Sequence, residues 1–220
     1  AVTICVPTES HFEVANFFLK EGIHTFVEKP ITSTVKQADE LIAIAEKNKL
    51  KLQVGHVERF NSAFESIKHF THDPLFMECH RLNQFPNRSL DIGVVMDLMI
   101  HDIDIILHLV QSQAEKIDAL GVGVASDTED IANARIQFRN GCVANVTASR
   151  MALKKERKIR VFSSDSYISL DYEKQKALIC KKSPPLASGE IDIKELDVKK
   201  IPDLKDYICS KLLQVEEIDM

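Results

Sequence analysis

The chain has no apolar run near the length of about 20 residues that a helix needs to cross a bilayer, and no signal-peptide pattern. It also has no basic excess, because 28 Lys and Arg stand against 33 Asp and Glu and the formal net charge is -5. We therefore expect neither a membrane partner nor a nucleic-acid partner. The composition is ordinary for a soluble globular protein, and 220 residues suffice for one large domain or two small ones.

Cysteine pairing has no support in the sequence. The five cysteines are odd in number, widely spaced and form no C-x-x-C motif. Reduced thiols are the simplest interpretation, and they favour a cytoplasmic protein. Cys5 lies in an apolar run, where we expect it to pack in the core. There is no initiator Met, and Ala1 leads directly into that run, so we expect a piece of a longer chain.

Residues 1–56 alternate between short apolar runs and amphipathic stretches. Such runs are typical of strands buried on both faces, and the stretches between them are typical of helices. We expect strands at 2–6, 23–27 and 51–55, and helices at 11–21 and 35–45. Short connections of this kind produce parallel pairing with right-handed crossovers.

Each expected helix has a capping residue and an apolar stripe. Ser10 is the expected cap of the first helix, and Ser33 or Thr34 of the second. Val14, Phe17, Phe18 and Glu21 are at helical spacing in the first helix. In the second helix one apolar stripe is formed by Val35, Ala38, Leu41, Ile42 and Ala45.

Polar residues follow all three expected strands. Pro7-Thr8 follows the first, Glu28-Lys29-Pro30 the second and Gly55-His56 the third. Because parallel strands end at the same edge of a sheet, these loops must emerge together, and ligands bind at that edge in open α/β sheets. The alternative for Lys29 alone is an ordinary lysine in a surface turn.

After residue 56 the pattern changes to a helix, a long helix and a series of hairpins, which predicts a second domain over 57–220. Asn140-Gly141 between two apolar runs predicts a hairpin turn. We expect a loop at 83–91 and another at 181–189, and no regular element after that. The expected helices are 61–70 and 94–110, and the expected strands are 75–82, 117–125, 131–138, 142–150, 157–163, 167–171 and 176–180.

The long apolar helix carries a polar stripe. Asp97, His101, Asp104 and His108 are spaced by four, three and four residues, which places them on one face. A buried stripe of this kind must pair internally or face a site. One interpretation is a set of Asp–His pairs. A metal site is another, but no third strong ligand is evident, and we expect no metal. The third is catalytic, with Asp97 and His101 facing a cleft and His101 as the base.

These motifs together resemble the Gfo/Idh/MocA oxidoreductases. The matching pieces are Val6-Pro7-Thr8 with His11, Glu28-Lys29-Pro30, Val54-Gly55 with Arg59-Phe60-Asn61, and the segment from Asp97 to Asp104. The resemblance covers residues 1 to about 110. It implies an α/β fold in which a partial Rossmann-type parallel sheet precedes an α+β domain with a large open, mostly antiparallel sheet.

The resemblance also implies roles for residues. Lys29 matches the active-site lysine, His101 the proton-transferring histidine and Asp97 the acid that helps to hold the substrate. The residues implied in binding NAD or NADP are Pro7, Thr8, His11, Glu28, Pro30 and Arg59. The second domain is expected to bind a sugar-like small molecule and to support a homo-oligomer, a dimer or tetramer, through its sheet.

Two departures from the family pattern matter. The G-x-G-x-x-G turn would precede Ala1, and Gly121-Val122-Gly123 does not replace it because it lies in an expected strand. Met99 stands where many members have Gly, in a variant associated with sugar-nucleotide 3-dehydrogenases. Arg150 and the basic run at 154–160 favour the same relatives, since they could meet a diphosphate; the alternative is a solvated strand face.

Two functional hypotheses result. The first is an oxidoreductase that transfers a hydride between a secondary alcohol of a sugar, sugar nucleotide or polyol and NAD(P). The second is a non-catalytic fragment or family member that binds a sugar nucleotide or dinucleotide, or acts as an interaction protein. The presence of Lys29, Asp97 and His101 favours the first hypothesis.

Overall fold

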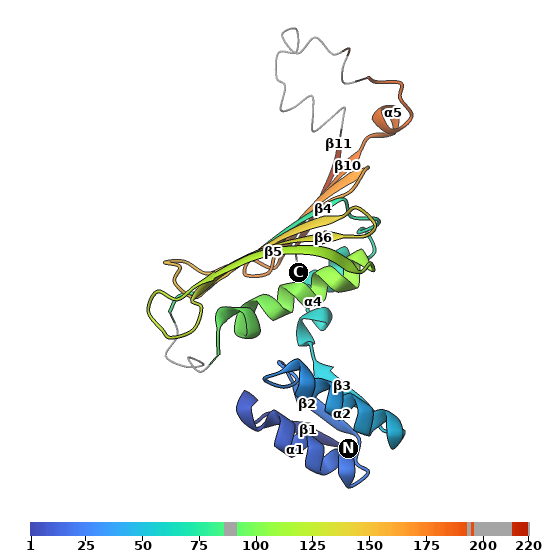
Figure 1. Ribbon diagram of the computed structural model, residues 1–220. Coiled ribbons are helices and arrows are strands. Elements are labelled where there is room, and N and C mark those ends of the chain that lie inside the picture. The colour runs from blue at the N-terminus through green and yellow to red at the C-terminus, as the bar shows by residue number, and fades with distance from the viewer. Residues whose placement is uncertain (86–91, 193–194, 196–212, 220) are drawn as a thin grey trace. The chain divides into compact units, whose positions relative to one another are not determined.

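The chain consists of two compact units, Ala1–Val57 and Glu58–Met220, drawn in Figure 1. The structure is a computed structural model that describes residues 1–85, 92–192, 195 and 213–219. Each unit has a separate hydrophobic core of its own. Among the described residues, no helix combines the length and the hydropathy needed to cross a membrane.

The first unit is a three-stranded parallel sheet with two helices, in the predicted β-α-β-α-β order. Its strands are ordered β1-β2-β3, and both neighbouring pairs are parallel. Ile4, Val27 and Val54 are in register across the sheet, and the first two belong to the core with Leu19 and Leu41 of the helices. The elements are β1 (Val2–Ile4), α1 (Thr8–Lys20), β2 (Thr25–Glu28), α2 (Val35–Lys47) and β3 (Leu52–Gly55).

Helix α1 differs from the prediction in its start and in its buried face. It begins at Thr8, directly after Pro7, so Ser10 lies inside the first turn and does not cap it. The buried line is His11, Ala15 and Leu19, whereas Phe17 is 60% exposed. Of the predicted stripe, Val14 and Phe18 are half-buried and pack against this core, whereas Phe17 lies outside it.

Three further predictions in this unit have different outcomes. Thr34 caps α2 as predicted, because its side chain accepts a hydrogen bond of 3.3 Å from the Gln37 N–H. In that helix Leu41 and Ala45 are buried, but Val35 and Ile42 are exposed. Cys5 is also exposed, since β1 ends at Ile4 and successive strand residues point to opposite faces. The predicted core packing of Cys5 is therefore wrong.

The second unit is built on one eight-stranded sheet in the order β11-β10-β9-β8-β4-β7-β6-β5. All neighbouring pairs are antiparallel except β4 and β7, which are parallel. The predicted open, mostly antiparallel sheet is thus confirmed. Its strands are β4 (Phe76–Leu82), β5 (Ala114–Val122), β6 (Ile131–Phe138), β7 (Val143–Ser149), β8 (Glu156–Phe162), β9 (Ser166–Asp171), β10 (Lys176–Lys182) and β11 (Leu213–Asp219).

The helical segments of this unit are η1 (Val57–Phe60), α3 (Ser62–Lys68), the π-helical turn η2 (Val95–Met99), α4 (Ile100–Val110) and the short α5 (Pro184–Ala187). Of these, α3, η2 and α4 pack on one face of the sheet (Figure 1). Alternate residues of the central strands, such as Cys79, Val146 and Ile159, are buried beneath them together with Phe64 and Ile106.

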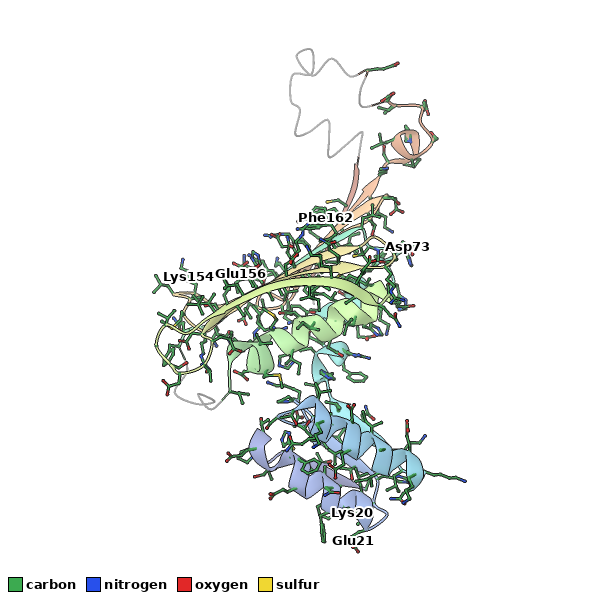
Figure 2. The ribbon with its side chains drawn as sticks, viewed as in Figure 1. Lys20, Glu21, Asp73, Lys154, Glu156 and Phe162 are labelled. Carbon is green, nitrogen blue, oxygen red and sulfur yellow. The ribbon has the colours of Figure 1, made fainter. Side chains whose placement is uncertain are left out.

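The opposite face of the sheet is half-exposed and carries many charges. Arg160 donates to Glu78 at 2.7 Å, and Lys158 lies 3.7 Å from Glu156. Figure 2 shows Glu156 and Phe162 at the two ends of β8. The part of the basic run at 154–160 that lies in β8 therefore has acidic neighbours on this strand face. This agrees with the interpretation of the run as a solvated strand face.

Three local predictions for this unit can be scored. The hairpin turn at Asn140-Gly141 joins β6 to β7 as predicted. Strand β11 was missed, and α5 lies within the expected loop at 181–189. Most of the expected loop at 83–91 lies outside the described residues.

We expect the core of the second unit to be sensitive to truncation. Leu170 is fully buried in β9, whereas Leu153 is 91% exposed. Leu170→Ala should lower the free energy of unfolding by about 2–5 kcal/mol because it leaves a cavity. Leu153→Ala should change it by less than about 0.5 kcal/mol. Urea unfolding followed by circular dichroism measures both, and equal effects of the two substitutions would contradict this packing.

Candidate functional site

The three loops after β1, β2 and β3 lie at one edge of the parallel sheet. Pro7 and Thr8 connect β1 to α1, Glu28 ends β2, and Gly55 ends β3. Pro7 is exposed, while Thr8 and Glu28 are half-buried. The predicted convergence of these loops is therefore present within the first unit.

The two ring nitrogens of His11 contact backbone carbonyls in two of these loops. His11 is 1% exposed, with its Nδ1 2.7 Å from the carbonyl oxygen of Pro30 and its Nε2 2.9 Å from that of Val6. Its ring is thus enclosed by backbone carbonyls. The sequence predicted His11 as a cofactor-binding residue; its position indicates that it acts by holding the loop of Lys29 against the loop of Pro7.

Glu28, Lys29 and Pro30 form the exit from β2. The Glu28 carboxylate accepts a hydrogen bond of 3.3 Å from the Lys29 N–H, and the Lys29–Pro30 peptide is cis. Gly55 is needed beside this carboxylate, because a Cβ there would lie 2.9 Å from the Phe26 ring and 3.0 Å from the Glu28 Oε1. Lys29 is half-buried at the edge where ligands bind in parallel α/β sheets.

In the second unit, Asp97 lies in the π-turn η2 and His101 in the first turn of α4. Both are half-buried. A π-turn is wound less tightly than an α-helix, and such turns occur frequently at functional sites. It reduces the angular offset between residues four apart, so Asp97 and His101 share a face more closely than in a regular α-helix.

The two other acids of the helix are held by arginines. Asp102 accepts two hydrogen bonds from Arg81 of β4, at 2.8 and 3.0 Å, and Glu58 of η1 lies 3.3 Å from the same guanidinium. Asp104 is bound by both Nε and Nη2 of Arg59, the first at 2.7 Å. Asp104 is therefore paired with an arginine, a partner that the interpretation of the stripe as Asp–His pairs did not include.

Electrostatics in this cluster follow from burial and pairing. Burial raises the pKa of Asp102, and Arg81 offsets part of that rise. Burial alone would lower the pKa of Arg81, but the attraction of Asp102 outweighs it and the pKa is raised. Arg81 and Glu58 were not among the predicted residues; the alternation of β4 indicated an inward position for residue 81 but not its partner.

Two expectations about ligands can be compared with the structure. Arg150, considered for a diphosphate, is 1% exposed and donates to Asp130 at 2.6 Å, so its guanidinium does not face solvent. That expectation is corrected. Across the described ranges, no three His, Cys, Asp or Glu side chains are grouped so as to hold a metal ion.

Comparison with known proteins identifies the family. Residues 1–56 match the family described as "Oxidoreductase family, NAD-binding Rossmann fold", and residues 53–169 match the "GFO/IDH/MocA C-terminal domain". The chain belongs to the Gfo/Idh/MocA oxidoreductase family. The resemblance inferred from the motifs is thereby confirmed.

Two similar proteins illustrate the range of the family. UDP-N-acetylglucosamine 3-dehydrogenase of Acidithiobacillus ferrooxidans is 40% identical over 173 residues, 78% of this chain and 55% of the relative. A solved structure of that enzyme has a TM-score of 0.82 and 34% identity, and covers 99% of this chain and 64% of its own. Myo-inositol 2-dehydrogenase of Thermotoga maritima is 26% identical, over 81% of this chain and 58% of the relative. The chain thus spans little more than half the length of these curated relatives.

We expect the Arg81–Asp102 pair to stabilise the second unit, because each side chain neutralises the buried charge of the other. Each side chain is 3% exposed. Arg81→Met should cost about 3–5 kcal/mol of unfolding free energy, because it leaves a carboxylate buried without its partner. The double variant Arg81→Met/Asp102→Leu should recover much of that loss. Urea titration measures both changes.

The control for this cycle is the exposed pair Lys116–Asp118 on β5. Lys116→Met should cost less than about 1 kcal/mol. If the double variant of the buried pair lost as much stability as the two single variants together, the coupling between Arg81 and Asp102 would be refuted.

Proposed function

We propose that this chain is part of an NAD(P)-dependent dehydrogenase that acts on a secondary alcohol of a sugar, sugar nucleotide or polyol. The observation that carries the proposal is the division of polar residues on the η2–α4 segment. Arginines bind Asp102 and Asp104, whereas the π-turn gives Asp97 and His101 a common face. In the first unit, Lys29 follows β2 at the edge of the parallel sheet where ligands bind in such folds.

In this mechanism His101 accepts the proton of the reacting hydroxyl group. Lys29 hydrogen-bonds the same oxygen and stabilises the charge that develops on it. Asp97 orients the substrate through neighbouring hydroxyls. The protein supplies position and electrostatics, while the bound nicotinamide supplies the redox chemistry.

The first unit has features that fit a dinucleotide. Helix α1 begins at Thr8 without a side-chain cap, so backbone N–H groups of its first turn remain available to a polar or anionic group. We propose that Pro7, Thr8, Glu28 and Pro30 line the cofactor and that His11 holds their loops. We propose that Arg59 contributes to the site through its ion pair with Asp104. Residues 1–56 would then be the later part of a dinucleotide-binding domain, and residues 57–220 the substrate and oligomerisation domain.

Among sugar-like substrates, a UDP-sugar is favoured by the higher identity to UDP-N-acetylglucosamine 3-dehydrogenase than to myo-inositol 2-dehydrogenase. We further propose a cytoplasmic location, because Cys79 and Cys142 are buried as free thiols. Burial raises the pKa of Cys142 to about 11, so this thiol remains protonated and unreactive near neutral pH.

The proposal predicts that Lys29→Ala and His101→Ala each lower kcat by about 10²–10⁴-fold, since each removes a group that acts on the reacting oxygen. The assay follows reduction of NAD and of NADP with UDP-N-acetylglucosamine, free sugars or inositols. It uses the chain extended at its N-terminus to the length of its relatives. Near-normal turnover by either variant at saturating cofactor would refute the assigned role.

Matched controls exist for both substitutions. Lys36 of α2 and His72 are exposed, and Lys36→Ala and His72→Ala should leave kcat within about twofold. If the parent protein binds NADH, seen as a change in fluorescence, but oxidises none of these substrates, the non-catalytic alternative gains support.

We also propose that the half-exposed face of the large sheet joins copies of the protein into a dimer or tetramer. At one end of this face Phe162 contacts Phe76 and Tyr167, with ring centroids 5.8 and 4.8 Å apart. A hollow of about 300 Å³ beside them is lined by Phe162, Tyr167 and Cys180, among others. Adjacent aromatic rings with charged surroundings are typical of an interface core with a polar rim.

Phe162→Glu should therefore reduce the molar mass measured by light scattering toward that of one chain, because it places a charge in the interface. Phe17→Glu is the control, since Phe17 is an exposed aromatic residue of the first unit. A monomeric parent protein, or an unchanged mass for Phe162→Glu, would contradict this interface.

A further inference from the structure

The segment that carries Asp97 and His101 is anchored by a distant hairpin. The Val94 N–H donates to the backbone oxygen of Glu129 at 2.9 Å. The Val95 N–H donates to the Glu129 carboxylate at 3.2 Å. The segment has no side-chain cap of its own, because the residue before η2 is Val94. Glu129, at the end of the turn between β5 and β6, thus satisfies two of the orphan N–H groups that begin a helix.

Gly93 makes this close approach of Glu129 feasible. A Cβ at that position would lie 1.9 Å from the Glu129 Oε1 and 2.1 Å from Cδ. No side chain other than hydrogen fits there while the carboxylate keeps its place. The glycine and the carboxylate therefore form one unit that fixes where η2 begins.

Behind Glu129 lies a buried ion pair. Asp130 is 0% exposed and accepts hydrogen bonds from the N–H groups of Val124 and Ala125, both at 2.7 Å, and from Arg150. These backbone N–H groups, with Arg150, hold the pKa of Asp130 well below its usual range. The carboxylate thus remains charged and the turn between β5 and β6 remains closed around it.

Arg150 extends this network to the start of the helical segment. It donates to the carbonyl oxygen of Ile92 at 3.0 Å, and to the hydroxyls of Ser126 and Thr128 at 2.8 and 2.7 Å. The residues on both sides of Gly93 are therefore held, Ile92 by Arg150 and Val94 by Glu129. Figure 1 shows the β5–β6 turn at the end of the sheet where η2 begins.

We propose that Glu129, backed by the Arg150–Asp130 pair, is a positioning residue that sets the π-turn and thereby the placement of Asp97 relative to His101. The inference rests on the proposed function for the chemical roles of Asp97 and His101. It adds a residue 32 positions after Asp97 in the sequence that touches neither substrate nor cofactor. Because the reacting groups must be held within a fraction of an ångström, loss of this anchor affects turnover more than binding.

The test compares four variants of the N-terminally extended protein: Glu129→Ala, Glu129→Gln, Asp127→Ala and Gly93→Ala. Glu129→Ala removes the carboxylate and leaves the buried Arg150–Asp130 pair in place. Glu129→Gln keeps an oxygen that accepts from Val95. Asp127→Ala is the matched control, because Asp127 is an exposed acid in the same turn. For each variant, kcat and KM for the sugar substrate are measured, together with amide hydrogen exchange of a peptide covering residues 93–100.

We expect Glu129→Ala to lower kcat by about 10–100-fold with KM changed by less than about threefold. It should also speed exchange in residues 93–100, whereas peptides from β7 and β8 keep their protection. Glu129→Gln should restore kcat to within about fivefold, and Asp127→Ala should match the parent. Gly93→Ala, which displaces the same carboxylate, should reproduce the effect of Glu129→Ala.

Two results would overturn the inference. One is normal exchange at residues 93–100 in Glu129→Ala. The other is an equal loss of turnover in Asp127→Ala, which would indicate general damage to the turn. Hydrogen exchange does not depend on activity. If the parent protein had no turnover, the proposed function would be refuted, but exchange at residues 93–100 would still test whether Glu129 anchors η2.

Discussion

The pairing of α4 with two arginines is the interaction on which the second unit depends. Isolated carboxylates are costly to bury, and this helix buries Asp102 and Asp104 in its apolar environment. Two residues correspond to about 200° around an α-helix, so Arg81 and Arg59 hold nearly opposite sides of α4. The helix cannot rotate about its axis without breaking one of these bidentate pairs. Its rotation determines in turn where His101 faces.

The same pairing shows how charges on one helix come to differ in role. Asp97, Asp102 and Asp104 of the η2–α4 segment look alike in sequence, and spacing alone places Asp97 and Asp104 in one polar stripe. The structure separates them by what the neighbouring elements supply: β4 and η1 each present an arginine. An acid with a bidentate arginine partner fixes the fold, as Asp102 and Asp104 do. Asp97 lies in the π-turn, on the half-buried face that it shares with His101.

The predictable parts of the fold are those set by local patterns. The alternation of β6 and β7, the Asn140-Gly141 turn and the parallel order of the first unit follow from periodicity and turn chemistry. The remaining features depend on partners far along the chain. Arg81 is set by Asp102, 21 residues later, and the start of η2 is set by Glu129, 34 residues after Val95. Periodicity carries no information about such pairs.

Among the candidate site residues too, the sequence does not predict which groups a polar side chain contacts. Motifs identified Lys29, His101 and the loops around them, but residue type alone did not reveal that His11 lies between two carbonyl oxygens or that Arg150 faces Asp130. In both cases the polar residue makes hydrogen bonds within its own unit, His11 to two backbone carbonyls and Arg150 to a carboxylate. Such groups are buried and saturated with hydrogen bonds, so their loss changes geometry across several residues. Loops and the start of a helix need this support, because neither kind of element has a fixed position without it.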